Sequence, residues 1–198
     1  MVATAFIEEI EKKRLENWCE WMRQKRPQVR KMIYLSTTGV YPQEEQVWKE
    51  SMTFEGVTHS AKLRLMTEHI LSQFFELTII RPGGIYGRGR NLLQRIMDHR
   101  SLPKSSRFIH RIHVEDLAGV VRSCVDQNLQ EEVINVVDQF ACPSVEVLQW
   151  LVEHQQLQEE SWKTTKAEIL ACIHNTPRDT IRKRVISNEK LIQKLKYT

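Results

Sequence analysis

The sequence has no stretch of about 18 consecutive apolar residues, so it predicts no helix that crosses a membrane. Charged residues interrupt the apolar ones from Met1 to Lys13, and this pattern does not predict a secretory signal. The few cysteines form no Cys-x-x-Cys pair and lack metal-ligand spacing. They are Cys19, Cys124, Cys142 and Cys172. We therefore expect a cytoplasmic protein with reduced thiols and no bound metal.

Neither sign of charge dominates, because 29 basic and 25 acidic residues give a net charge of +4 at pH 7. The basic residues are interleaved with acids, and only the segment 178–184 is densely positive. Such a surface could attract a phosphate-bearing partner, although a solvated charged face explains the pattern equally well. The sequence does not favour nucleic-acid binding, because aromatic residues are not interleaved among the basic ones.

The pattern of apolar residues alternates between helical and strand periodicity along the 198 residues. We expect strands over 31–36, 77–81, 107–114 and 133–137. We expect helices over 4–26, 60–75, 91–99 and 144–154, and others beginning near 115, at a capping box over 165–168, and at 187. This order predicts one α/β domain, with a mainly parallel sheet covered by helices on both faces.

Three motifs follow one another at spacings typical of one family. They are Ile33-Tyr-Leu-Ser-Thr-Thr-Gly-Val-Tyr41, Ile80-Arg-Pro-Gly-Gly-Ile-Tyr-Gly-Arg-Gly89 and Arg111-Ile-His-Val-Glu-Asp-Leu-Ala118. Together they resemble the extended short-chain dehydrogenase/reductases, the NAD-dependent epimerase/dehydratase family, and most closely its atypical members. The resemblance covers roughly residues 30–140 and implies a partial Rossmann-like, doubly wound sheet. Residues 141–198 would form a mostly helical C-terminal part of the same domain.

The resemblance also implies catalytic positions. Thr37 occupies the place of the family's hydroxyl residue at a strand end, and Lys62 matches the lysine of its Tyr-x-x-x-Lys motif. That motif places an ammonium beside a phenol on one helix face, which lowers the pKa of the phenol and makes it a base. The tyrosine position here is Thr58, whose hydroxyl is too weak an acid for this role. His59 and Tyr41 are the nearest alternatives in the sequence.

Four of the seven glycines lie between Gly83 and Gly89, directly after a predicted strand. Parallel sheets bind ligands at such bends, although a tight turn alone would also need glycines. In the resembling family this loop passes the nicotinamide end of the cofactor. The resemblance therefore implies that NAD or NADP contacts Ser36, Arg81, Pro82, Gly83, Gly84 and Ile85. Arg88 and Arg90 could reach phosphates.

A Gly-x-Gly-x-x-Gly motif, which lets a backbone approach a pyrophosphate, does not occur near the start of the sequence. The resemblance implies that the first strands of the fold are absent, that the cofactor site is incomplete, and that the end is truncated. A sheet edge and apolar helix faces would then be uncovered, which favours self-association or a homo-oligomer.

Two classes of function are compatible with these observations. The resemblance implies an NAD(P)-dependent oxidoreductase or sugar-nucleotide epimerase/dehydratase that acts on a carbonyl compound or a nucleotide sugar. The alternative is a catalytically silent nucleotide-binding or regulatory module, or a fragment of a longer enzyme, which the substitution at Thr58 favours. His110 and His113 form a His-x-x-His pair, but on a strand they would point to opposite faces, so we do not expect a metal site.

Overall fold

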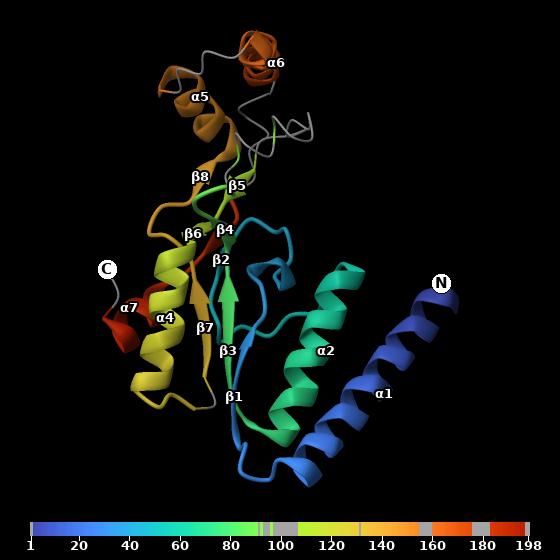
Figure 1. Cartoon of the computed structure of the whole chain (residues 1–198). Helices are drawn as coiled ribbons and strands as arrows, with labels where there is room; N and C mark the ends of the chain where they lie inside the picture. The colour runs from blue at the N-terminus through green and yellow to red at the C-terminus, as the bar shows by residue number, and fades with distance from the viewer. Residues whose placement is uncertain are drawn as a thin grey trace.

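A three-stranded parallel sheet forms the centre of the molecule (Figure 1). The computed structural model describes residues 2–90, 92, 96, 107–130, 132–154, 160–175 and 183–196. The strands, in their order across the sheet, are β1 (Lys31–Leu35), β3 (Glu76–Pro82) and β7 (Val133–Val136). Tyr34 lies opposite Ile79, and Ile80 lies opposite Ile134. Because the three strands are parallel, their carboxyl ends meet at one edge.

Helices cover both faces of this sheet (Figure 1). They are α1 (Val2–Lys25) and α2 (His59–Phe74) on one face, and α4 (Val114–Asp126) and α7 (Glu189–Leu195) on the other. Leu77 and Ile79 of β3 belong to the core that contains residues of α1 and α2, whereas Ile80 belongs to the core that contains residues of α4 and α7. Burial on both faces is the reason that β3 is apolar along most of its length.

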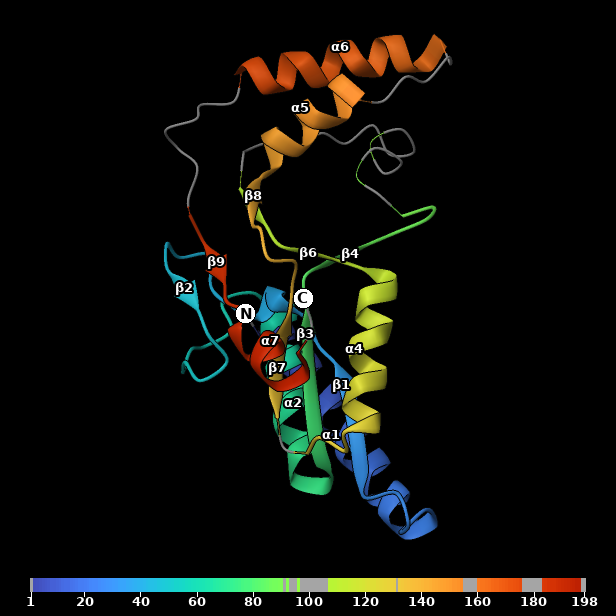
Figure 2. The same cartoon turned by 90° about the vertical axis from the view of Figure 1, so that its left-hand side faces the viewer.

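Short strand pairs and a 3₁₀ turn lie around the carboxyl edge of the sheet (Figure 1). They are η1 (Thr38–Val40), β2 (Val47–Trp48) paired with β9 (Val185–Ile186), β4 (Gly84–Tyr86) paired with β6 (Arg111–His113), and β5 (Phe108–Ile109) paired with β8 (Cys142–Pro143). Beyond them, as Figure 2 shows, lie α5 (Ser144–His154) and α6 (Glu160–Asn175). These two helices share a separate core that includes Leu148, Trp162 and Ile169.

The predicted α/β architecture is confirmed, with a mainly parallel sheet and helices on both faces. The strands predicted over 31–36, 77–81 and 133–137 correspond to β1, β3 and β7. Of the helix predicted over 91–99, only Leu92 and Ile96 are among the described residues. No helix in the described ranges is both long and apolar enough to cross a bilayer.

Two details of the prediction are wrong. The single strand expected over 107–114 is divided at His110, because its first half pairs with β8 and its second half with β4. The capping box expected to begin a helix at Thr165 lies inside α6. That helix begins earlier because Trp162, which precedes the box, is already buried against α5.

A buried ion pair joins α2 to the sheet. Glu68 and Arg81 are 5% and 6% exposed and form two hydrogen bonds, from Arg81 Nε to Oε1 (3.1 Å) and from Nη2 to Oε2 (2.5 Å). Arg81 Nη1 donates to the Tyr41 hydroxyl (2.9 Å), which donates to Asn135 Oδ1 (2.8 Å). Burial alone would lower the pKa of Arg81, but hydrogen bonds to Glu68 and Tyr41 raise it above its ordinary value. The guanidinium therefore stays charged in the interior.

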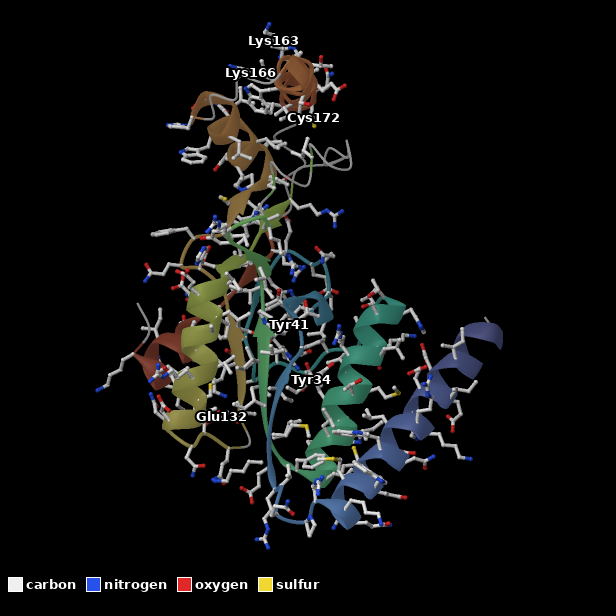
Figure 3. All side chains as sticks on the ribbon, viewed as in Figure 1. Tyr34, Tyr41, Glu132, Lys163, Lys166 and Cys172 are labelled. Atoms are coloured by element: carbon white, nitrogen blue, oxygen red, sulfur yellow. The ribbon has the colours of Figure 1, made fainter. Side chains whose placement is uncertain are left out.

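Asn135 extends this network toward the C-terminal segment. Its side-chain Nδ2 donates to the carbonyl of Ser187 (3.2 Å), and its backbone N–H donates to Glu50 Oε1 (2.9 Å). The Tyr41 ring lies near the carboxyl edge of the sheet (Figure 3), with its centroid 4.7 Å from that of Phe54. The network thus connects α2, β3, β7, the segment after η1 and the segment before α7.

We predict that Glu68→Gln lowers the free energy of unfolding by about 3 kcal/mol or more, because it leaves the Arg81 charge buried without a counter-charge. Glu189→Gln is the matched control, since Glu189 also pairs with a cation, Lys49, but at 2.8 Å on an exposed surface. That change should cost less than about 1 kcal/mol. Urea unfolding measures both, and equal losses would contradict the role given to Glu68.

Candidate functional site

The hydroxyl of Thr37 caps the turn that follows β1. Thr37 has extended backbone angles (φ −163°, ψ 148°), and its Oγ1 accepts a hydrogen bond from the N–H of Gly39 (3.0 Å). The neighbouring Thr38 is buried, and its hydroxyl donates to the carbonyl of Pro82 (3.2 Å). These two bonds fix the turn and fasten it to the end of β3. Thr37 is thus held at the carboxyl edge of the sheet, where the resemblance predicted it.

Thr58 has a structural task at the start of α2. Its Oγ1 accepts a hydrogen bond from the N–H of Ala61 (3.1 Å), which makes it the N-cap of the helix. Lys62 follows in the first turns and is exposed. The turn η1 packs against α2, and α2 begins at the carboxyl edge of the sheet (Figure 1). The structure therefore brings the segments that carry Thr37, Thr58 and Lys62 to the same edge.

The two alternative proton donors are both engaged elsewhere. Burial raises the pKa of Tyr41, and this effect exceeds the opposing influence of Arg81. Its phenol is therefore not a base near neutral pH. The imidazole Nδ1 of His59 lies 3.0 Å from Glu8 Oε1 and links the start of α2 to α1. Neither residue takes the place of the missing tyrosine in this arrangement.

The glycine bend after β3 is closely packed on its inner side. The N–H of Gly83 donates to Val136 O (3.0 Å), and the N–H of Gly84 donates to His110 O (2.7 Å). A Cβ atom on Gly83 would lie 2.6 Å from that His110 oxygen, so only glycine fits there. Gly84 is exposed, whereas Ile85 packs against the core shared with α4 and α7. The N–H groups of Gly83 and Gly84 are therefore already bonded, so a ligand at the bend would contact the backbone without a hydrogen bond from these two groups.

The remaining predicted cofactor contacts differ from one another in exposure. The guanidinium of Arg81 is bonded to Glu68 within the buried network. Pro82 is buried, and its carbonyl accepts a hydrogen bond from Thr38. Arg88 and Arg90 lie on the exposed outer part of the bend. Ser36 follows β1 directly, and its N–H donates to Ile80 O (2.7 Å). Its hydroxyl is buried and has no hydrogen-bond partner in the ranges that the structure describes, which marks it as a candidate contact for a ligand at this edge.

His110 and His113 serve the fold in different ways. His110 Nε2 accepts from the N–H of Ile186 (2.9 Å), and His113 Nδ1 accepts from the N–H of Glu115 (3.4 Å). Burial and the nearby charge of Arg184 lower the pKa of His110 to about 4. Among the described residues, no cluster of three or more histidines, cysteines or carboxylates is arranged to hold a metal.

Tyr86 and Asp138 form a second group of titratable side chains at this edge. The rings of Tyr86 and His113 make a T-shaped contact with 5.2 Å between centroids, and the N–H of Asp138 donates to Arg111 O (2.6 Å). Burial and then the charge of Asp116 raise the pKa of Asp138. Asp138 is not among the residues predicted from the sequence, although its position just after a buried strand was the available signal.

Solved structures with the same arrangement of elements identify the fold. An NAD-dependent epimerase/dehydratase, so assigned provisionally, from Methylobacillus flagellatus has a TM-score of 0.65 and 25% identity, over 83% of this chain and 57% of that chain. The UDP-glucuronic acid 4-epimerase from Bacillus cereus, in complex with NAD, has a TM-score of 0.64 and 14% identity, over 93% and 60%. The chain has the fold of the NAD-dependent epimerases and dehydratases.

Another structure with the epimerase/dehydratase fold is the dTDP-glucose 4,6-dehydratase from Streptomyces venezuelae, with a TM-score of 0.63 and 11% identity. The match covers all of this chain and 63% of that chain. This chain therefore spans somewhat less than two thirds of the length of these three structures. No protein-family model matches the sequence, and no curated protein does. The family resemblance seen in the three motifs is thus confirmed in three dimensions.

The low pKa of His110 predicts a pH dependence of stability. Its imidazole stays neutral in the folded protein down to about pH 4, whereas in the unfolded chain it takes up a proton below its ordinary pKa of 6.5. Stability is therefore lost as the pH falls from 6.5 toward 4.

His110→Gln should reduce this loss, because the amide oxygen can accept from Ile186 without titrating. We expect the two pH profiles of urea unfolding to differ by on the order of 1–2 kcal/mol, allowing for partial exposure of the ring. Parallel profiles between pH 6.5 and 4 would disprove this account of His110.

Proposed function

We propose that this chain is an atypical NAD(P)-dependent oxidoreductase or sugar-nucleotide epimerase/dehydratase-like protein. The observation that carries the proposal is the meeting of Ser36 and Thr37 with the bend of Gly83 and Gly84 at one edge of a parallel sheet. Parallel sheets bind ligands at this edge. The substrate is a carbonyl compound or a nucleotide sugar, and the names of two solved neighbours, which include UDP-glucuronic acid and dTDP-glucose, support this choice.

The residues at the edge fit the nicotinamide end of the cofactor. The hydroxyl of Ser36, which is unpaired within the described part of the chain, and the exposed backbone of Gly84 would contact it. When bound, the cofactor supplies the exchange of a hydride. The hydroxyl of Thr37 accepts from Gly39 but keeps its own hydrogen, so it can donate to a substrate oxygen. Lys62 would place a positive charge near the same oxygen as negative charge develops there.

A specific observation favours the second candidate, a nucleotide-binding module without turnover. Thr58 stands at the position of the catalytic phenol and caps α2 instead. The buried Tyr41, whose pKa is raised, does not replace it. This candidate shares the cofactor site of the first and lacks only its proton-transfer group. Binding therefore tests both candidates together, and turnover separates them.

We expect NADH or NADPH to quench tryptophan fluorescence at micromolar concentration. Gly84→Val should weaken this binding about tenfold or more, because its side chain would project from the exposed bend into the cofactor. The fold should tolerate the change, since an added Cβ meets its nearest neighbour at an ordinary 3.5 Å. Asp126→Val, at the end of α4 away from this edge, is the control. Absence of quenching in the wild type, or equal binding by both variants, would refute the proposed site.

Restoring the phenol tests the catalytic positions. Thr58→Tyr recreates Tyr-x-x-x-Lys with Lys62, and Thr58→Phe supplies the ring without the hydroxyl. Both changes remove the helix cap and should cost about 1 kcal/mol of stability. We expect the tyrosine variant to turn over its substrate about 10²-fold faster than the phenylalanine variant. Reduction of a carbonyl compound is followed as NAD(P)H absorbance, and conversion of a nucleotide sugar, which leaves the cofactor unchanged overall, is followed by chromatography of the product. Equal rates would show that Thr58 and Lys62 do not face the reacting atoms.

A further inference from the structure

Arg184 is a partly buried cation at the carboxyl edge of the sheet. It immediately precedes β9, and its Nη2 donates to the carbonyl of Thr38 (2.7 Å) in the turn after β1. Its Nε is buried and has no hydrogen-bond partner among the described residues. It is also the last residue of the densely basic segment 178–184. The guanidinium is therefore anchored at one nitrogen beside the candidate catalytic turn, and the described part of the chain leaves its Nε without a partner.

The charge of Arg184 is not balanced by the described part of the chain. Arg81, the other guanidinium withdrawn from water here, has Glu68 as a bidentate partner. No described carboxylate pairs with Arg184, since the nearby Glu45 accepts instead from the backbone N–H of Lys183 (3.0 Å). A desolvated cation without a counter-charge is costly, so an anion bound from solution would stabilise this arrangement.

A second guanidinium adds to the positive charge. Burial is the main reason that the pKa of Arg184 lies below its ordinary value, and the charge of Arg107 lowers it further. Arg107 is exposed and immediately precedes β5, three residues before His110. Burial and the charge of Arg184 lower the pKa of His110 to about 4, so its ring is neutral near pH 7 and adds no charge here. The hydrogen bond from the N–H of Ile186 to His110 brings the segments that carry the two arginines together. Two like charges on adjoining segments favour an anion of more than one charge.

We propose that Arg184 and Arg107 form a binding site for a phosphate group at the carboxyl edge of β1 and β3, beside Thr38. Guanidinium groups bind phosphate through paired, charge-assisted hydrogen bonds, and two cations match a phosphate dianion better than a carboxylate. The site stands independently of any redox activity. If the proposed function is also correct, this group belongs to a phosphorylated substrate that lies next to Thr37.

Calorimetric titration with pyrophosphate, at constant ionic strength and without cofactor, tests the proposal. We expect the wild type to bind pyrophosphate, and Arg184→Gln and Arg107→Gln each to weaken binding about tenfold or more. Arg122→Gln is the matched control, because Arg122 is an exposed arginine of α4 that pairs with Asp126 at 3.5 Å. Its affinity should equal that of the wild type. Since no cofactor is present, a failure of the proposed function leaves this result unaffected.

Thermal unfolding separates a binding role from a structural one. Without ligand, Arg184→Gln should melt at or above the wild-type temperature, because it removes an unbalanced charge. Pyrophosphate should raise the melting temperature of the wild type but not of this variant. Titrations with inorganic phosphate and with UDP then identify the source: tighter binding of UDP indicates a nucleotide, and equal binding indicates phosphate alone. No binding by the wild type, or equal losses in the Arg184 and Arg122 variants, overturns the proposal.

Discussion

The buried ion pair between Glu68 and Arg81 is the constraint on which the carboxyl edge depends. It withdraws a guanidinium from water in the middle strand, so the charge must be balanced in place. The balancing groups come from α2, from the segment after η1 and from β7, through Glu68, Tyr41 and Asn135. Because each group bonds to the next, the middle of α2, strand β3 and the segment after η1 are held together. Thr37, just before η1, and Lys62, near the start of α2, lie on segments that this network joins.

The hydroxyls that the motifs place at the catalytic positions also hold the backbone together. Thr37 caps η1 and Thr58 caps α2, so each stabilises the element that carries it. The capping role has different consequences at Thr37 and at Thr58. A cap that only accepts a hydrogen bond keeps its proton available, so the cap at Thr37 is compatible with the role that we propose for it. At Thr58 the hydroxyl caps the helix, so α2 forms its first turn with no tyrosine at this position.

The sheet was predictable because its strands are continuous apolar runs, and the motifs placed Thr37 and Gly83 at its edge. The pairing of Arg81 with Glu68 could not be predicted from the sequence. It joins a strand residue to a helix residue that the pattern of apolar residues does not distinguish from other polar residues. Tyr41 was considered as a base, but its burial depends on Trp48 and Phe54 packing around it. The prediction that a helix begins at the capping box of Thr165 was wrong, because the tertiary burial of Trp162 outweighs the local sequence preference. Nothing in the sequence around Arg184 predicted its hydrogen bond to the carbonyl of Thr38.

Amide hydrogen exchange, recorded with and without NADH, tests the central claim most directly. The claim is that the end of β1, the turn η1 and the bend after β3 form one cofactor-binding edge. It predicts that NADH slows exchange in peptides over 36–42 and 82–87, while peptides from α5 and from the far end of α4 are unchanged. Protection confined to other segments, with no change over 36–42 and 82–87, would contradict the claim.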